Sequence, residues 1–148
     1  MRICSASSKE TKQIAARLAK TISLSSSRSG ALVLALEGNL GAGKTTFVQG
    51  FARALGAKEN VLSPTFVLIK VYPLNTKRYA LRHLIHIDCY RLDSPKDLLH
   101  LGFKDLLKDK DAIILIEWAD RIRRIIPKDA IRIKFEHGKR PGERVLRI

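Results

Sequence analysis

The chain has 148 residues, of which 45% are hydrophobic and 28% are charged. This balance is typical of a single globular domain, here residues 1–148, and it excludes a disordered tail and a fibrous repeat. The 28 Lys and Arg residues outnumber the 14 Asp and Glu residues, so the formal net charge is +14.

This positive charge is spread along the whole chain. Residues 1–74 carry 10 basic and 3 acidic side chains, and residues 75–148 carry 18 and 11. A basic fold, rather than a basic arm, predicts polyanionic partners: nucleotides, nucleic acid or an acidic protein surface. The alternative is that the charge serves solubility alone.

The cysteines and histidines do not form a metal-binding pattern. Two cysteines are too few for a disulfide scaffold or a zinc site. His83 and His86 lie in a strand-like run, where residues three apart point to opposite faces. Residues 1–30 show no signal-peptide core, and no apolar run reaches the roughly 18 residues of a membrane helix. We therefore expect a cytoplasmic protein with no membrane partner.

The first half of the chain alternates helix and strand signals. In chain order it predicts an amphipathic helix, a buried strand, a glycine-rich loop and a second helix: residues 8–21, 31–37, 38–43 and 44–55. Ser7 or Ser8 is the expected N-cap of the first helix. Gly56 is expected to stop the second helix.

The second half begins with two strand-like runs, residues 65–72 and 80–88. Their short connection predicts an antiparallel hairpin, because a parallel pair needs a long crossover. Later signals predict two short helices, a buried strand, a helix, a half-buried edge strand and a last strand: residues 94–101, 103–107, 112–118, 120–126, 131–135 and 144–148. The whole predicts an α/β domain whose central sheet is mixed, partly antiparallel and flanked by helices.

One segment, residues 38–45, matches the pattern G-x-x-x-x-G-K-[ST] of a phosphate-binding loop. An apolar strand leads into it and a helix leads out, as this loop requires. Its glycines allow backbone conformations that are closed to other residues, so successive amides can turn inward and surround an anion. The N-terminus of the following helix adds partial positive charge. The segment predicts a P-loop NTPase.

Three side chains at the end of this loop have expected roles. Lys44 reaches the β- and γ-phosphates, the Thr45 hydroxyl binds Mg²⁺, and Thr46 contacts the α-phosphate. The alternative interpretation is a glycine-rich turn before a helix, with the lysine in solvent.

A phosphate loop needs a second metal anchor, and this is expected to be an acidic residue at the end of a buried strand. Two residues qualify. Glu117 follows the stronger strand signal and takes the metal role. Asp88 then either positions the attacking group or holds a metal-bound water. The alternative for each is a strand-end charge in solvent.

Four segments together resemble one protein family: GNLGAGKTT at 38–46, SPTF at 63–66, HIDCYRL at 86–92 and IEWADR at 116–121. In this order they resemble the bacterial TsaE (YjeE) family, the ATPase subunit of the machinery that makes threonylcarbamoyladenosine in tRNA. The resemblance implies a small ATPase that binds ATP and Mg²⁺. It also implies two paralogous partner proteins, one of them the transferase that modifies tRNA adenosine 37, with ATP hydrolysis resetting the complex.

The resemblance also implies roles for particular residues. The nucleotide would be bound by the loop, by a neighbouring threonine and aromatic residue, and by a C-terminal arginine: Gly41, Ala42, Gly43, Lys44, Thr45, Thr46, Thr65, Trp118 and either Arg140 or Arg144. The metal would be bound by Thr45 and Glu117, and Asp88 would be the functional aspartate. The catalytic residues would then be Lys44, Asp88 and Glu117. Simple packing is the alternative role for Trp118, and Cys89 replaces an apolar residue and should pack as a small hydrophobe.

Other functions remain open at this point. A small P-loop kinase that phosphorylates a nucleoside or another small molecule would use Asp88 as base and residues 121–124 as a lid. A nucleotide-sensing module whose hydrolysis is incidental is a third hypothesis. Two basic groups would contact tRNA or an acidic partner, or lie in solvent: Arg121, Arg123 and Arg124, and Lys139, Arg140, Arg144 and Arg147.

Overall fold

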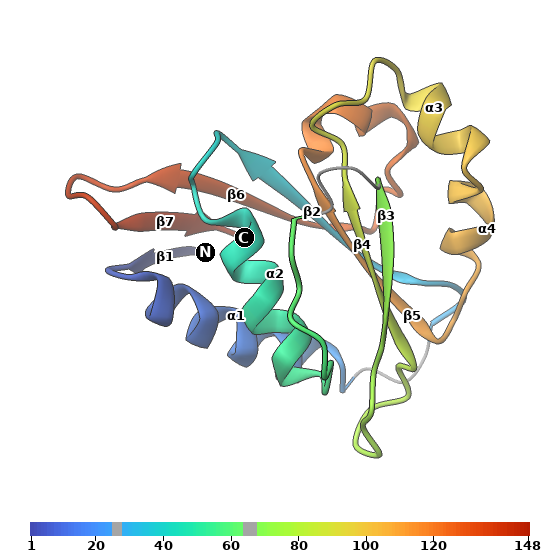
Figure 1. The fold of residues 1–148 in the computed structure, drawn as a ribbon, viewed down its shortest axis with the longest axis horizontal. Coiled ribbons are helices and arrows are strands. Elements are labelled where there is room, and N and C mark those ends of the chain that lie inside the picture. Colours follow the sequence, from blue (N-terminus) through green and yellow to red (C-terminus); the bar gives the residue numbers. More distant parts are fainter. Residues whose placement is uncertain (25–27, 64–67) are drawn as a thin grey trace.

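In the described residues, 1–24, 28–63 and 68–148, a computed structural model shows seven strands in one sheet with helices on both faces (Figure 1). The strands are β1 (Arg2–Ser5), β2 (Leu32–Gly38), β3 (Ile69–Pro73), β4 (His83–Asp88), β5 (Ala112–Glu117), β6 (Ile131–His137) and β7 (Arg144–Arg147). The helices are α1 (Ser8–Ile22), α2 (Lys44–Ala54), α3 (Pro95–His100), α4 (Phe103–Leu107) and the 3-10 helix η1 (Ala119–Ile125). The strand order across the sheet is β1-β7-β6-β2-β5-β4-β3.

The sheet is parallel at its centre and antiparallel at both edges. β2 pairs in parallel with β5 and β6, and β5 pairs in parallel with β4. β7 is antiparallel to β6 and β1, and β3 is antiparallel to β4. The apolar runs of β2 and β5 fit this centre, since parallel strands are covered on both faces. The predicted fold class and the predicted hairpin are confirmed.

The prediction that residues 131–135 form an edge strand is wrong. β6 pairs with β2 on one side and with β7 on the other, so it lies inside the sheet. Its alternation of apolar and basic residues has another cause, which is that one face of this part of the sheet lies in solvent. On that face Arg132 forms an ion pair with Glu37, and Lys134 forms one with Glu136. The alternation of apolar and basic residues therefore indicates a solvent-exposed face of the strand and not a position at the edge of the sheet.

β1 was not anticipated from the sequence. Its four residues, with only Ile3 strongly apolar, are too few to show an alternation. It pairs along its length with β7, and the amino group of Met1 donates a hydrogen bond to the Ile148 carbonyl at 2.6 Å. The two ends of the chain therefore lie side by side.

The helix starts follow the sequence signals closely. Ser7 caps α1, where its side chain accepts a hydrogen bond from the amide of Glu10 at 3.2 Å. Ser94 caps α3 in a reciprocal capping box with Asp97. The helix predicted at 120–126 is instead the 3-10 helix η1, which is interrupted by a non-helical conformation at Ile122.

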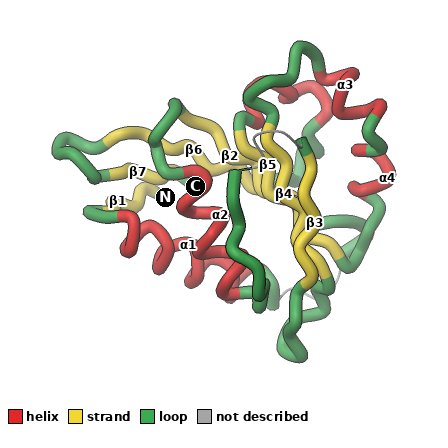
Figure 2. Tube along the Cα trace, viewed as in Figure 1, coloured by secondary structure: helices red, strands yellow, loops and turns green. Residues whose placement is uncertain are grey.

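Two layers of helices cover the sheet, and Figure 2 shows α1 and α2 on one side with α3 and α4 on the other. Alternate residues of each central strand face opposite layers. The α1–α2 side holds a core that includes Leu34, Leu36, Phe47, Phe51 and Leu115. The opposite side holds a core that includes Ala35, Leu98, Phe103, Ile114 and Ile116. No helix among the described residues has the length and apolar character that crossing a bilayer requires.

α1 and α2 approach each other closely at Gly50, where a Cβ would lie 2.6 Å from both the Cα and the carbonyl oxygen of Lys12. We expect Gly50→Val to push the helices apart and to lower the free energy of unfolding by about 1–3 kcal/mol. Arg53→Ala, at an exposed position of α2, should change it by less than about 0.5 kcal/mol. Urea unfolding followed by circular dichroism measures both values, and equal stabilities would contradict the close packing.

Candidate functional site

The phosphate loop lies at the carboxyl edge of the parallel strands. β2 ends at Gly38 and α2 begins at Lys44, as the motif predicts. Gly41 and Gly43 have φ angles of 72° and 98°, in the left-handed region that favours glycine. Gly43 is the N-cap residue of α2, so the turn ends where the first free amides of the helix begin. The backbone therefore has the form that an anion-binding loop needs.

The Lys44 side chain is buried at the base of the loop. Its Nζ donates hydrogen bonds to the carbonyl oxygens of Gly38 and Asn39 at 2.5 and 3.0 Å, and it lies 4.1 Å from the centre of the Trp118 ring. Burial lowers the pKa of the Lys44 ammonium, whereas the surrounding carboxylates, led by Glu117, act in the opposite direction. The loop thus holds a cation beside its own amides.

The two predicted carboxylates lie next to each other. Asp88 ends β4 and Glu117 ends β5, and the two residues are direct partners in the parallel pairing. The Thr45 hydroxyl donates to both carboxylate oxygens of Glu117, at 2.9 and 3.0 Å. Asp88 accepts hydrogen bonds from the Ser63 hydroxyl at 3.2 Å and from the Tyr90 amide at 2.9 Å. The register of β4 and β5 therefore sets the two carboxylates side by side, and α2 brings Thr45 into contact with Glu117.

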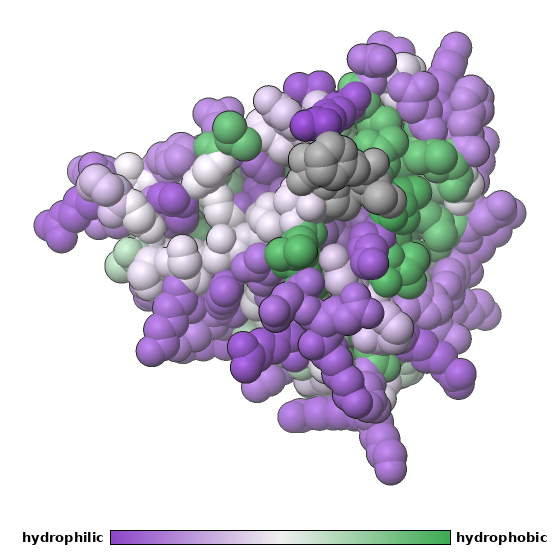
Figure 3. Space-filling view, in the orientation of Figure 1, coloured by the Kyte–Doolittle hydropathy of each residue, from purple (hydrophilic) through white to green (hydrophobic). Residues whose placement is uncertain are grey.

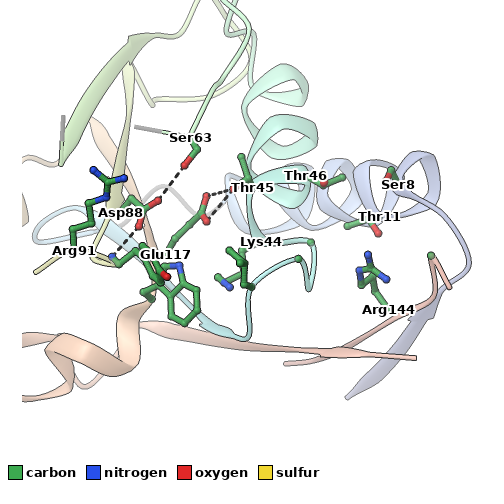
Figure 4. A pocket seen from close by; sticks show the side chains of 16 residues that line it. Ser8, Thr11, Lys44, Thr45, Thr46, Ser63, Asp88, Arg91, Glu117 and Arg144 are labelled. Atoms are coloured by element: carbon green, nitrogen blue, oxygen red, sulfur yellow. Dashed lines mark hydrogen bonds between the residues drawn. The ribbon is translucent and has the colours of Figure 1, made fainter. Parts of the chain in front are cut away.

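These groups line one pocket of about 350 Å³. Figure 4 shows Glu117, Asp88 and Ser63 on one side of Lys44 and Thr45, and Thr46, Ser8, Thr11 and Arg144 on the other. The remaining lining residues include the loop glycines Gly41 and Gly43 and the aromatic residues Tyr90 and Trp118. The pocket thus extends from the carboxylates across the loop to the start of α1.

The two candidate arginines lie in different places. Arg144 lines the pocket, and its side chain packs over Gly43, where a Cβ would meet the Arg144 Cγ at 3.6 Å. Arg140 lies in the turn between β6 and β7, where it interacts with Glu143, and it does not line the pocket. Ala42 is buried within the loop. Thr65 lies outside the described residues.

Trp118 occupies a special backbone position. It is the only non-glycine residue of the described chain with a positive φ, at 57°, and it caps η1. Its ring packs against Tyr90 with centroids 4.9 Å apart, and the guanidinium of Arg121 lies over both rings. The backbone conformation turns the aromatic side chain toward the pocket, as well as packing it beside the sheet.

Sequence reasoning missed several polar residues of the site, among them Tyr90 and Arg91, which line the pocket beside Asp88. Ser8 and Thr11 looked like ordinary first-turn residues of a helix, yet both line the pocket. His86 is completely buried, and its Nε2 lies 2.9 Å from Oε1 of Glu117. His86 could have been found from the sequence, because it is a polar residue in an apolar strand. It lies on the same face of β4 as Leu84 and Asp88.

The strand, the glycine loop with its buried lysine and the adjoining helix define a P-loop nucleotide-binding protein. Within that class the chain belongs to the TsaE family. A family model described as threonylcarbamoyl adenosine biosynthesis protein TsaE matches residues 5–146, and this confirms the resemblance noted in the sequence.

Individual relatives agree with this assignment. The tRNA threonylcarbamoyladenosine biosynthesis protein TsaE of Haemophilus influenzae is 36% identical over 107 residues, which are 72% of this chain and 64% of that protein. The protein of the same name from Bacillus subtilis is 39% identical over 111 residues, 75% of this chain and 63% of that one. These matches span slightly less than two thirds of the two relatives. The crystal structure of Bacillus subtilis YdiB is similar, with a TM-score of 0.69, 29% identity and coverage of 99% of this chain and 82% of that one.

The two cysteines should differ sharply in reactivity. Cys89 is buried in the core beneath η1, and burial raises its pKa to about 12, whereas Cys4 is exposed. At pH 8 the thiolate fraction of Cys89 is therefore about a thousandfold below that of an ordinary thiol. We expect a maleimide to label only Cys4 in the native protein and both residues in denaturant, as counted by mass spectrometry. Rapid labelling of a native Cys4→Ser variant would show that Cys89 is accessible.

Proposed function

We propose that the chain binds ATP with Mg²⁺, hydrolyses it, and is required for the threonylcarbamoyladenosine modification of tRNA adenosine 37. In this proposal it is a cytoplasmic, nucleotide-driven switch acting on a transferase complex of two paralogous proteins. The observation that carries the proposal is the contact between Thr45 at the end of the phosphate loop and Glu117 at the end of β5.

The donor set fits Mg²⁺. A hydroxyl and a carboxylate are oxygen ligands of the kind that Mg²⁺ prefers. Among the described residues no group of three or more His, Cys, Asp or Glu side chains could enclose a metal. Thr45 and Glu117 would therefore hold the ion together with phosphate oxygens and water, the usual arrangement for magnesium in nucleotide sites. The ion, when bound, would neutralise charge on the β- and γ-phosphates.

The chain's other residues would bind and orient the nucleotide. No side chain caps the start of α2 at Gly43, which leaves the first amides of the helix for a phosphate, and the Lys44 ammonium adds a positive charge at the base of the loop. Arg144 and Thr11 line the far side of the pocket, beyond Thr46, where the nucleoside would extend. Trp118 would place an aromatic face beside the phosphates and Lys44.

Asp88 is the residue best placed to orient the attacking water. It lies beside Glu117 in the sheet and accepts a hydrogen bond from Ser63. This side of the pocket is open, because Ser63 is exposed and Asp88 is only half-buried. Slow hydrolysis by the isolated chain is expected from such an open site. A partner that covers it would exclude bulk solvent, help to fix the one attacking water and so raise the rate.

The kinase alternative has less support. A lid over the nucleotide would need the arginines of η1 to be available to it, yet Arg123 forms an ion pair with Glu37 at 2.9 Å and Arg121 lies against Tyr90 and Trp118. Phosphate transfer from ATP to any member of a nucleoside panel would revive this alternative.

The first prediction of the proposal concerns nucleotide affinity. Lys44→Ala removes a charged donor to phosphate, and such bonds contribute about 1.5–3 kcal/mol, so ATP affinity should fall roughly 10- to 100-fold. Lys110→Ala removes an exposed lysine outside the pocket and should leave the affinity unchanged. Titration calorimetry with ATP and Mg²⁺ measures both, and equal affinities would refute the phosphate loop as the binding site.

A second prediction concerns the partners. The ATPase rate of the wild-type chain should be low alone and should rise at least about tenfold when the two paralogous proteins are added, since they would close the open site. Lys44→Ala should abolish tRNA modification in cells that depend on this chain, while Lys110→Ala supports it. Rapid hydrolysis by the isolated chain, unchanged by the partners, would contradict the proposed switch.

A further inference from the structure

A second large concavity lies between α1, α2 and residues 57–62, away from the loop. Its volume is about 1140 Å³, against about 350 Å³ for the nucleotide pocket. Four small residues line it: Ala16 of α1, Gly50 and Ala54 of α2, and Ala57 in the segment that follows α2. Leu62, with 68% of its surface exposed, lies at one end. We name this concavity the α1–α2 groove.

The edges of the α1–α2 groove are basic. The groove is lined by five exposed cations, Lys9, Lys12, Lys20, Arg53 and Lys58, and by one acidic residue, Glu59. None of the five cations forms an ion pair with any described residue, in contrast to the arginines of the sheet face, such as Arg132 and Arg147. In Figure 3 the surface over α1 and the lower part of α2 is mostly hydrophilic, with a small hydrophobic patch above it.

We propose that the α1–α2 groove binds an acidic, amphipathic segment of a partner protein. The small apolar residues and the exposed Leu62 would receive the apolar side of such a segment, and the five cations would pair with its acidic side chains. Nucleic acid fits less well, because a phosphate backbone gains nothing from the apolar residues. The inference rests on the proposed function, which requires a protein partner.

The groove is also connected to the nucleotide site. The Gln49 side chain of α2 donates a hydrogen bond to the Val61 carbonyl at 2.9 Å and so fastens the segment that forms one wall. The same segment continues into Ser63, which bonds to Asp88. A partner seated in the groove would therefore contact both α2, which begins with Lys44, and the segment that leads to Ser63.

The test compares two triple charge reversals that change the net charge equally. The groove variant carries three substitutions that reverse charges lining the groove: Lys12→Glu, Lys20→Glu and Arg53→Glu. Lys77→Glu with Lys110→Glu and Lys128→Glu alters exposed lysines that form no ion pair with described residues and lie outside it. Binding to the immobilised pair of paralogous partner proteins is measured with ATP and Mg²⁺. We expect the groove variant to bind at least tenfold more weakly and the control to bind within about twofold of wild type.

Other outcomes decide against the inference. Equal weakening by both triple variants would mean that general charge, and not the groove, attracts the partner, and a groove variant that binds like wild type would exclude the groove. Leu62→Ser should weaken binding of the protein pair and leave binding of tRNA unchanged. Loss of tRNA binding by the groove charge variant, with unchanged binding of the protein pair, would make RNA the occupant. If the wild-type chain neither binds the protein pair nor changes its ATPase rate when the pair is added, the proposed function itself fails. If the wild-type chain binds the pair and the groove variant binds equally well, only the inference about the groove fails.

A different observation supports a second inference. The His86 ring lies in the core of the sheet, and its Nε2 is 2.9 Å from Oε1 of Glu117. Its Nδ1 is buried and has no hydrogen-bond partner among the described residues. Because a carboxylate only accepts hydrogen bonds, Nε2 carries the proton. We infer that His86 is a positioning residue that holds the Glu117 carboxylate toward Thr45.

Two substitutions of His86 by side chains of similar size distinguish the positioning role from simple packing. Gln at position 86 retains an N–H donor and Met does not. The affinity of a fluorescent ADP is measured over a range of Mg²⁺ concentrations and in EDTA. We expect His86→Met to weaken apparent Mg²⁺ affinity about tenfold and His86→Gln to stay near wild type, with equal ADP affinities in EDTA. Wild-type Mg²⁺ dependence in His86→Met, or an equal loss in both variants, would overturn the inference.

Discussion

The site depends on one hydrogen-bonded contact, between the hydroxyl of Thr45 and the carboxylate of Glu117. It joins the start of α2 to the end of β5 and exists only because β2 and β5 are parallel neighbours. Parallel pairing sends both strands to the same edge of the sheet, so a loop that follows one strand meets a carboxylate that ends the other. The antiparallel strands outside this centre extend the sheet, and the one described strand residue that they supply to the pocket is Arg144 of β7, beside Gly142 in the turn before it.

The polar side chains around the contact between Thr45 and Glu117 are buried, and this holds them in fixed positions. Lys44, Glu117 and His86 are all buried, although charged and polar side chains are rarely so. Each has partners that offset the loss of water: loop carbonyls and an indole face for the lysine, and a hydroxyl and an imidazole for the glutamate. Such a network is held in one geometry, which is what binding a phosphate and a metal demands.

Much of this could be predicted from the sequence, because the relevant signals are local. The loop pattern correctly placed a loop over residues 38–43 between a strand and a helix that begins at Lys44, and the apolar runs ending in Asp88 and Glu117 placed both carboxylates at one edge. The features that the sequence did not predict depend on contacts between segments that are far apart in the chain. The position of β6 depends on which strands flank it, and the place of Thr11 in the pocket depends on how α1 packs against α2. Neither leaves a pattern in its own segment of the chain.

Thr45 and Glu117 are separated by 72 positions along the chain. During synthesis, β2, the loop and α2 leave the ribosome long before β5, so the loop has no carboxylate opposite it for most of translation. Pairing of β2 with β5 closes a long segment of chain, which is an entropically costly and slow step in folding. The anchor for the metal therefore appears late, together with the centre of the sheet, and a nascent chain that ends before β5 carries an incomplete site.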